Sequence, residues 1–147
     1  MNLVQRGVNN LASLEKTMLF LPKRLKVHQN NLYVCFNLSP IPEDMVVTSM
    51  VLHIPLPPRA GQTVLLLHEV MEPWEDGKAG HTPPLLSHVL EKIVVPAETE
   101  EGQLAVPPNR WQPLRNSETN GLFVTIETKE GVGFSGNEPP FLLVGTL

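Results

Sequence analysis

Short apolar runs, each followed by a polar or proline-rich break, recur along most of this chain. The clearest run covers residues 32–38, in which every second residue is a large apolar one. The second half of residues 46–56 repeats the same alternation. Further strands are predicted over residues 17–27, 63–71, 87–95, 103–106, 121–128, 130–135 and 141–147. Roughly eight or nine strands at this spacing predict an all-β fold, an antiparallel jelly-roll-like β-sandwich.

The pattern predicts one domain behind an N-terminal arm. A chain of 147 residues fits a single domain, and no segment alternates strands with long helices, which argues against a parallel α/β fold. The sandwich is predicted over residues 17–147. Residues 1–16 differ, because Val4, Val8 and Leu11 recur at helical spacing. This segment is compatible with a short amphipathic helix or with a flexible arm.

Local signals refine three places along the chain. Pro22 interrupts the first predicted strand, so we expect that strand at a sheet edge or at a bulge. The Asn-Asn pair at 30–31 is typical of a turn. Residues 107–114 are predicted to form one helical turn around Trp111.

Composition and charge limit the classes of partner that this protein is expected to bind. Apolar residues make up 41% of the chain and charged residues 18%, and the net charge is −4 without any lysine or arginine cluster. Nucleic acid is therefore not an expected partner, because phosphate binding needs a basic face. No apolar run is long enough for a transmembrane helix, so we expect no membrane insertion. No basic stretch followed by an apolar segment opens the chain, so no secretory signal is expected.

Catalytic motifs are missing from the sequence. It contains no Gly-x-Ser-x-Gly elbow, no P-loop and no Gly-x-Gly-x-x-Gly, and no nucleophile has a nominated base. We therefore predict a protein that is not an enzyme. Cys35 lies within an apolar run and is expected to be a buried thiol.

Metal and cofactor sites are also not predicted. His53 and His68 lie in strands that follow one another in the sequence and could face each other, either as a polar pair or as a metal site. Acidic residues gather in the loop from Glu72 to Gly77 and again in residues 98–101. Calcium is possible at the first of these, although the alternating Asp/Asn/Gly pattern of calcium loops is missing.

Three aromatic side chains allow a carbohydrate site. Tyr33, Trp74 and Trp111 can stack on sugar rings if they are exposed, or pack in the core if they are not. Hydrogen-bond partners for a sugar would be Glu72, Glu75 and Asp76.

The order of several motifs resembles that of DNRLRE-type domains. A Phe-Asn-Leu-Ser corner at 36–39 precedes an Ile-Pro turn at 41–42 and a Val-Thr-Ser-Met-Val-Leu strand at 47–52. Residues 70–75 end a predicted strand in Trp and an acid. Further on, Trp111 precedes the sequence Asn-Gly-Leu-Phe-Val at 120–124. The last motif, at 133–144, is Gly-Phe-Ser-Gly-Asn-Glu-Pro-Pro-Phe-Leu-Leu-Val. The propeptide of transforming growth factor-β-like proteins has a similar corner.

The resemblance extends from about residue 19 to residue 147, and the chain departs from the family at several positions. Asn37 stands where the family usually has Asp, and the Thr-Trp-Asn segment after Trp74 is missing. The resemblance implies a jelly-roll module of surface, adhesive or carbohydrate-binding proteins.

Together these features predict a non-catalytic structural protein that self-associates into a homo-oligomer or polymer, such as a coat or filament subunit on a bacterial or spore surface. Sandwich edges and the arm would make the contacts, since edge strands can accept strands from a neighbour. The arm residues expected to take part are Leu3, Val4, Val8 and Leu11. The alternative function is a carbohydrate-binding module that recognises a polysaccharide.

Overall fold

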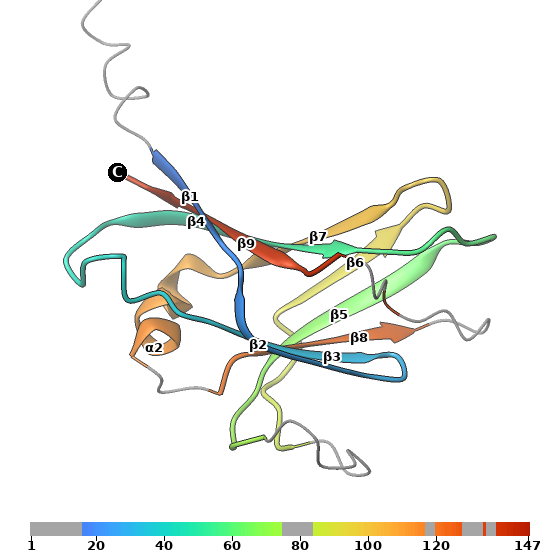
Figure 1. The fold of residues 1–147 in the computed structure, drawn as a ribbon, viewed down its shortest axis with the longest axis horizontal. Coiled ribbons are helices and arrows are strands. Elements are labelled where there is room, and N and C mark those ends of the chain that lie inside the picture. The colour runs from blue at the N-terminus through green and yellow to red at the C-terminus, as the bar shows by residue number, and fades with distance from the viewer. Residues whose placement is uncertain (1–15, 75–83, 117–119, 128–133, 135–137) are drawn as a thin grey trace, which may run out of the picture.

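The computed structural model describes residues 16–74, 84–116, 120–127, 134 and 138–147. Within these residues, nine strands form two facing sheets (Figure 1). The strands are β1 (Lys16–Phe20), β2 (Pro22–His28), β3 (Asn31–Phe36), β4 (Val47–Pro55), β5 (Thr63–Glu69), β6 (Glu91–Val95), β7 (Glu101–Val106), β8 (Leu122–Glu127) and β9 (Phe141–Thr146). The predicted all-β sandwich is confirmed.

The strand order is that of a jelly roll. The first sheet has the order β1-β9-β4-β7, and the second sheet has the order β2-β3-β8-β5-β6, with every pair antiparallel. Without β2, the two sheets have four strands each, joined as two Greek keys. Strand β2 is an addition at the edge of the second sheet, beside β3.

Strands β1 and β2 cross from one sheet to the other. Leu21 separates them, β1 lies at the edge of the first sheet, and β2 lies at the edge of the second. The pairing of β2 with β3 shifts between Pro22 and Arg24. The expected edge or bulge at Pro22 is therefore confirmed, as suits a residue without an N–H. The single strand predicted over residues 17–27 is wrong, because it is divided into β1 and β2 in different sheets.

The core lies between the two sheets. Met50, Leu52 and Ile54 point inward from β4, as the alternation predicts, and all three are buried. Leu65 and Leu67 meet them from β5 in the second sheet. The two short helices η2 (Pro108–Arg110) and α2 (Trp111–Arg115) form the predicted helical turn, and Trp111 contributes to this core. Among the described residues, no helix is long and apolar enough to cross a membrane.

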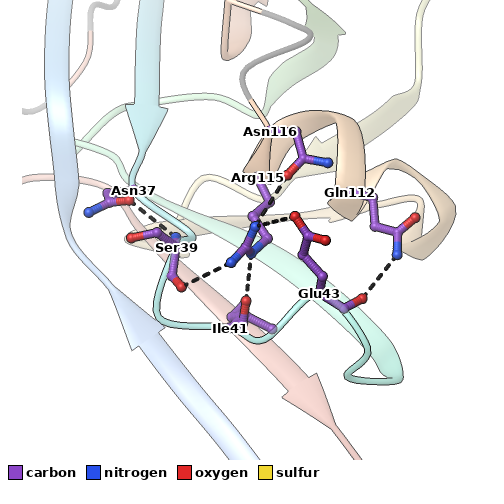
Figure 2. A network of polar contacts seen from close by, with 7 residues as sticks. All are labelled: Asn37, Ser39, Ile41, Glu43, Gln112, Arg115 and Asn116. Carbon is purple, nitrogen blue, oxygen red and sulfur yellow. Dashed lines mark hydrogen bonds and ion pairs between the residues drawn. The ribbon is translucent and has the colours of Figure 1, made fainter.

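One guanidinium fixes the corner that joins the two sheets. Arg115 in α2 donates from Nε to the carbonyl of Ile41 at 2.6 Å and from Nη2 to the carbonyl of Ser39 at 3.4 Å (Figure 2). Its Nη1 lies 3.1 Å from a carboxylate oxygen of Glu43. Gln112 donates to the carbonyl of Glu43 at 3.1 Å. The connection from β3 to β4 is thus held against α2 by side-chain hydrogen bonds to the backbone carbonyls of Ser39, Ile41 and Glu43.

Several sequence predictions need correction. The strands predicted over 46–56 and 63–71, from which His53 and His68 could have faced each other, are β4 and β5 and lie in different sheets. The turn before β3 consists of Gln29 and Asn30, one residue earlier than predicted, and Gln29 has a φ of 57°. Strand β6 begins at Glu91, because residues 87–90 curve to donate to the carbonyls of β5. Most of the strand predicted over 130–135 lies outside the described residues, and Phe134 is not in a strand.

Candidate assembly surfaces

The basic flank is the side of the sandwich formed by β1 and β2, residues 16–28. It contains four basic residues and no acidic one, which corrects the expectation that the chain has no lysine or arginine cluster: Lys16, Lys23, Arg24 and Lys26. Lys16 and Lys23 are exposed. Because β1 and β2 are edge strands, this flank also presents backbone groups that no described strand pairs.

The acidic flank is the opposite side, formed by β6, the turn at 96–100 and β7, residues 91–106. Here the charge is reversed, since four acidic residues accompany one lysine: Glu91, Lys92, Glu98, Glu100 and Glu101. Strands β6 and β7 are the remaining edge strands of the two sheets. Arg59 packs behind the turn, where it donates to the carbonyls of Pro96 at 2.6 Å and Thr99 at 2.7 Å. Its guanidinium therefore orders the turn that carries Glu98 and Glu100.

Apolar side chains accompany the charges on both flanks. Leu25 and Val27 of β2 pair with core residues of β3 and so point inward, yet they are 37% and 47% exposed. They are uncovered because the second sheet is one strand wider than the first. On the acidic flank, Val94 is 54% exposed. Both flanks thus combine charge with exposed apolar area, which is typical of association surfaces.

Two of the predicted sugar-binding aromatics lie together, but both are buried. Tyr33 and Trp74 are 3% and 7% exposed, and they form a small cluster with Phe123 and Val70 on the outer face of the second sheet. The Trp74 ring lies 5.6 Å from that of Tyr33, and its Nε1 donates to the carbonyl of Asn120 at 2.6 Å. Burial raises the pKa of Tyr33 above its ordinary value of 10.0. The cluster is a packed cover on this sheet, and of the two interpretations it supports packing.

The other predicted ligand-binding residues do not gather into a site. Trp111 is 7% exposed and belongs to the main core. Glu72 is exposed and accepts a hydrogen bond from the backbone N–H of Leu85 at 2.6 Å. Glu75 and Asp76 lie outside the described residues, as do the arm residues Leu3, Val4, Val8 and Leu11. In the part of the chain that the structure describes, no three His, Cys, Asp or Glu residues gather as metal ligands.

His53 and His68, which could have faced each other, do not, because their strands lie in different sheets and both side chains point away from the core. His53 stacks on Phe141 with ring centroids 4.5 Å apart, and its Nδ1 lies 2.7 Å from a carboxylate oxygen of Glu101. The Nδ1 of His68 lies 2.8 Å from the carbonyl of Ser87. Each histidine therefore has its own local partners.

A buried carboxylate, that of Glu69, forms an ion pair that the sequence does not predict. Glu69, only 3% exposed, receives two hydrogen bonds from Arg110, at 2.7 Å to one oxygen and 3.2 Å to the other. The pair lies beside a cleft of about 610 Å³ that Met71 and His88 also line. It ties η2 to the end of β5, and sequence offers no sign of it because the two residues are 41 positions apart.

Comparison of the chain with protein-family models finds no match. Comparison with curated proteins finds no significant match either. The likeness to DNRLRE-type domains therefore stays a prediction of family membership.

Proposed function

We propose that this protein is a structural subunit whose copies join flank to flank into a polymer. The observation that carries this proposal is the opposite charge of the two edges of the sandwich. The basic flank of one copy is complementary to the acidic flank of the next, which favours the encounter and sets its orientation.

The geometry makes such a contact self-propagating. The two flanks lie on opposite sides of the sandwich, so one copy offers both halves of the joint at once. A contact between two different surfaces of the same molecule is heterologous, and it builds rings or open filaments rather than closed dimers. The charges suit a polymer of identical subunits.

Charge alone would give a weak joint. A solvent-exposed ion pair contributes about 0.2–1 kcal/mol, and salt screens it. Burial of Leu25 and Val27 on one side and Val94 on the other adds roughly 25 cal/mol for each Å² of apolar surface removed from water. The ion pairs would then select the partner, and apolar burial with edge-strand contacts would hold it.

The test changes one flank at a time. Lys16→Glu/Lys23→Glu leaves the basic flank with no net charge, and Glu98→Lys/Glu100→Lys makes the acidic flank slightly positive. By light scattering across a concentration series, we expect the wild-type mass to grow with concentration. Each variant alone should stay at the monomer mass of 16.3 kDa.

Mixing the two variants gives the decisive result. Their remaining native flanks are complementary, whereas their altered flanks do not attract each other. The mixture should therefore form a heterodimer and stop there. A wild-type chain that stays monomeric, or variants that polymerise as the wild type does, would contradict the proposal, and a screen for polysaccharide binding would follow.

A further inference from the structure

The cleft beside the Glu69–Arg110 pair has a volume of about 610 Å³ and lies where the end of β5 meets η2 and the segment that leads into β6. This volume is in the range of ligand pockets in proteins. Most of the residues around it are apolar, and they come from three separate parts of the chain: Met71, Leu85, Leu86, Leu90 and Pro107. No Phe, Tyr or Trp of the described residues lines the cleft, so it lacks a stacking platform for a sugar ring.

The ion pair presents its positive member to the cleft. Arg110 donates to both carboxylate oxygens of Glu69, from Nε at 2.7 Å and from Nη2 at 3.2 Å. The side chain of Glu69 is 3% exposed, whereas that of Arg110 is 36% exposed. A ligand in the cleft can therefore reach the guanidinium, and the buried carboxylate holds that guanidinium in one orientation.

Recognition of an anion explains this pair better than stability does. Buried charges lose their hydration, and their mutual attraction often does no more than offset that cost. A guanidinium that is already held in place, by contrast, is preorganised to receive a planar carboxylate. The exposed side chains of His88 and Asn109 add hydrogen-bond donors to the same cleft. Glu69 is the only acidic residue in the described lining, and Arg110 already pairs with it.

We propose that this cleft binds a small amphipathic carboxylate. Its head group pairs with the guanidinium of Arg110, and its apolar chain or ring lies against the leucine side chains of the cleft. A ligand with a cationic head group gains no such pairing, and a small anion without an apolar part gains little burial. None of the residues that line the cleft belongs to the two charged flanks, so the site is separate from the proposed polymer contact.

The first experiment compares octanoate with octylammonium, which have the same chain and opposite charge, by isothermal titration calorimetry of the full-length chain. Octanoate should bind with a Kd on the order of 1 mM or below, as suits a ligand of its size. Octylammonium should bind at least about tenfold more weakly, because the guanidinium repels it. Hexanoate should also bind more weakly than octanoate, by up to about fourfold for each CH₂ removed. Equal binding of octanoate and octylammonium, or no binding of octanoate, would overturn the proposal.

Leu85 offers variants with little risk to folding, because its side chain is 64% exposed. Leu85→Glu should raise the Kd of octanoate at least about fivefold, since it places a like charge at the cleft, and Leu85→Lys should lower the Kd. Val89→Glu is the matched control: Val89 is 43% exposed and lies in the same segment, but it does not line the cleft. It should leave the Kd nearly unchanged. The same loss in Leu85→Glu and Val89→Glu would mean that octanoate binds elsewhere, contrary to the proposal.

A double variant tests the ion pair itself. Glu69→Gln/Arg110→Gln removes both charges together, so it leaves no unpaired charge in the buried position. Circular dichroism establishes that the variant is folded, and the folded variant should no longer prefer octanoate to octylammonium. A preference that persists would exclude Arg110 as the recognition group. If the double variant does not fold, the Leu85 and Val89 variants decide the question.

The same titration in the Lys16→Glu/Lys23→Glu variant separates this site from the proposed polymer. Its altered residues lie on the basic flank and do not line the cleft. Octanoate should bind this variant as it binds the wild type. A wild-type chain that does not polymerise would contradict the proposed function alone, whereas a cleft that does not distinguish octanoate from octylammonium would contradict this inference alone.

Discussion

The two sheets of this sandwich treat their outer faces differently. The second sheet carries aromatic rings outward at Tyr33 and Phe123, and the chain covers them with Trp74. The first sheet carries an apolar row outward, formed by Leu19, Leu143, Val51 and Ala105, and its exposed ends Leu19 and Ala105 show that the described residues do not cover it fully. Large apolar area on the second sheet is thus buried within one chain, whereas on the first sheet it stays partly exposed.

Two basic side chains of β2 also lie over the aromatic rings of this cluster. Arg24 of β2 lies 4.1 Å from the Trp74 ring centroid and donates to the Trp74 carbonyl at 2.6 Å. Lys26 lies 5.6 Å from the ring centroid of Tyr33. Both cations make cation–π contacts that shield the rings from solvent. The two faces thus differ in that Trp74, together with Arg24 and Lys26, covers the apolar outer face of the second sheet.

The largest expected loss of stability comes from removing the Trp74 side chain, which covers the rings of the second sheet. Trp74→Ala should lower the free energy of unfolding by about 3–5 kcal/mol, because it opens a cavity over Tyr33 and leaves the carbonyl of Asn120 with only the weak Cys35 thiol donor at 3.3 Å. Urea denaturation followed by circular dichroism measures it. Trp74→Phe, which keeps most of the packing, should cost less. Equal stability of Trp74→Ala and the wild type would mean that the cover contributes nothing.

A matched pair of phenylalanines tests the difference between the faces directly. Phe123 on the second sheet is 4% exposed, while Phe141 on the first sheet is half-buried. Phe123→Ala should cost about 3–4 kcal/mol of stability and Phe141→Ala about 1 kcal/mol. The same denaturation series gives both values. If the two losses were alike, the two faces would be equally buried in solution.

The smallest effect should come from alkaline titration of Tyr33, the sole tyrosine of the chain. Because burial raises its pKa in the folded state, absorbance at the tyrosinate band should rise only above pH 10. The unfolded chain ionises first, so stability is complete below pH 10 and falls above it. The slope should not exceed about 1.4 kcal/mol for each pH unit. Titration at the ordinary pKa would show that the ring is open to water.

Sequence predicted the strands well because side-chain alternation is a local property. The inward residues Met50, Leu52 and Ile54 and the edge position of Pro22 follow from their own segments. Sheet membership does not, and nothing in the two segments indicates that β4 and β5 lie in different sheets. Two equally apolar strands give no sign of which partner each will pair with.

The positions of the two charged flanks could not be predicted either, because they depend on the strand order. The basic residues of 16–28 and the acidic residues of 91–106 are ordinary surface charge in the sequence, and they become opposite flanks only through the strand order. Glu69 shows the same limit, since its partner Arg110 is brought to it by the fold. Tyr33 and Trp74 were identified as candidates from the sequence. Their burial could not be, because it depends on the fold placing Trp74 against Tyr33 on the outward side of β3.

The unequal width of the sheets gives each copy the outline of a wedge. Five strands on one side and four on the other differ by about 4.8 Å across layers that are about 10 Å apart. In the proposed polymer, wedges laid flank to flank would follow an arc, with the narrower sheet on the inside. A chain of such subunits would be a curved thread rather than a straight rod, and its direction of bending would be set by the single extra strand β2.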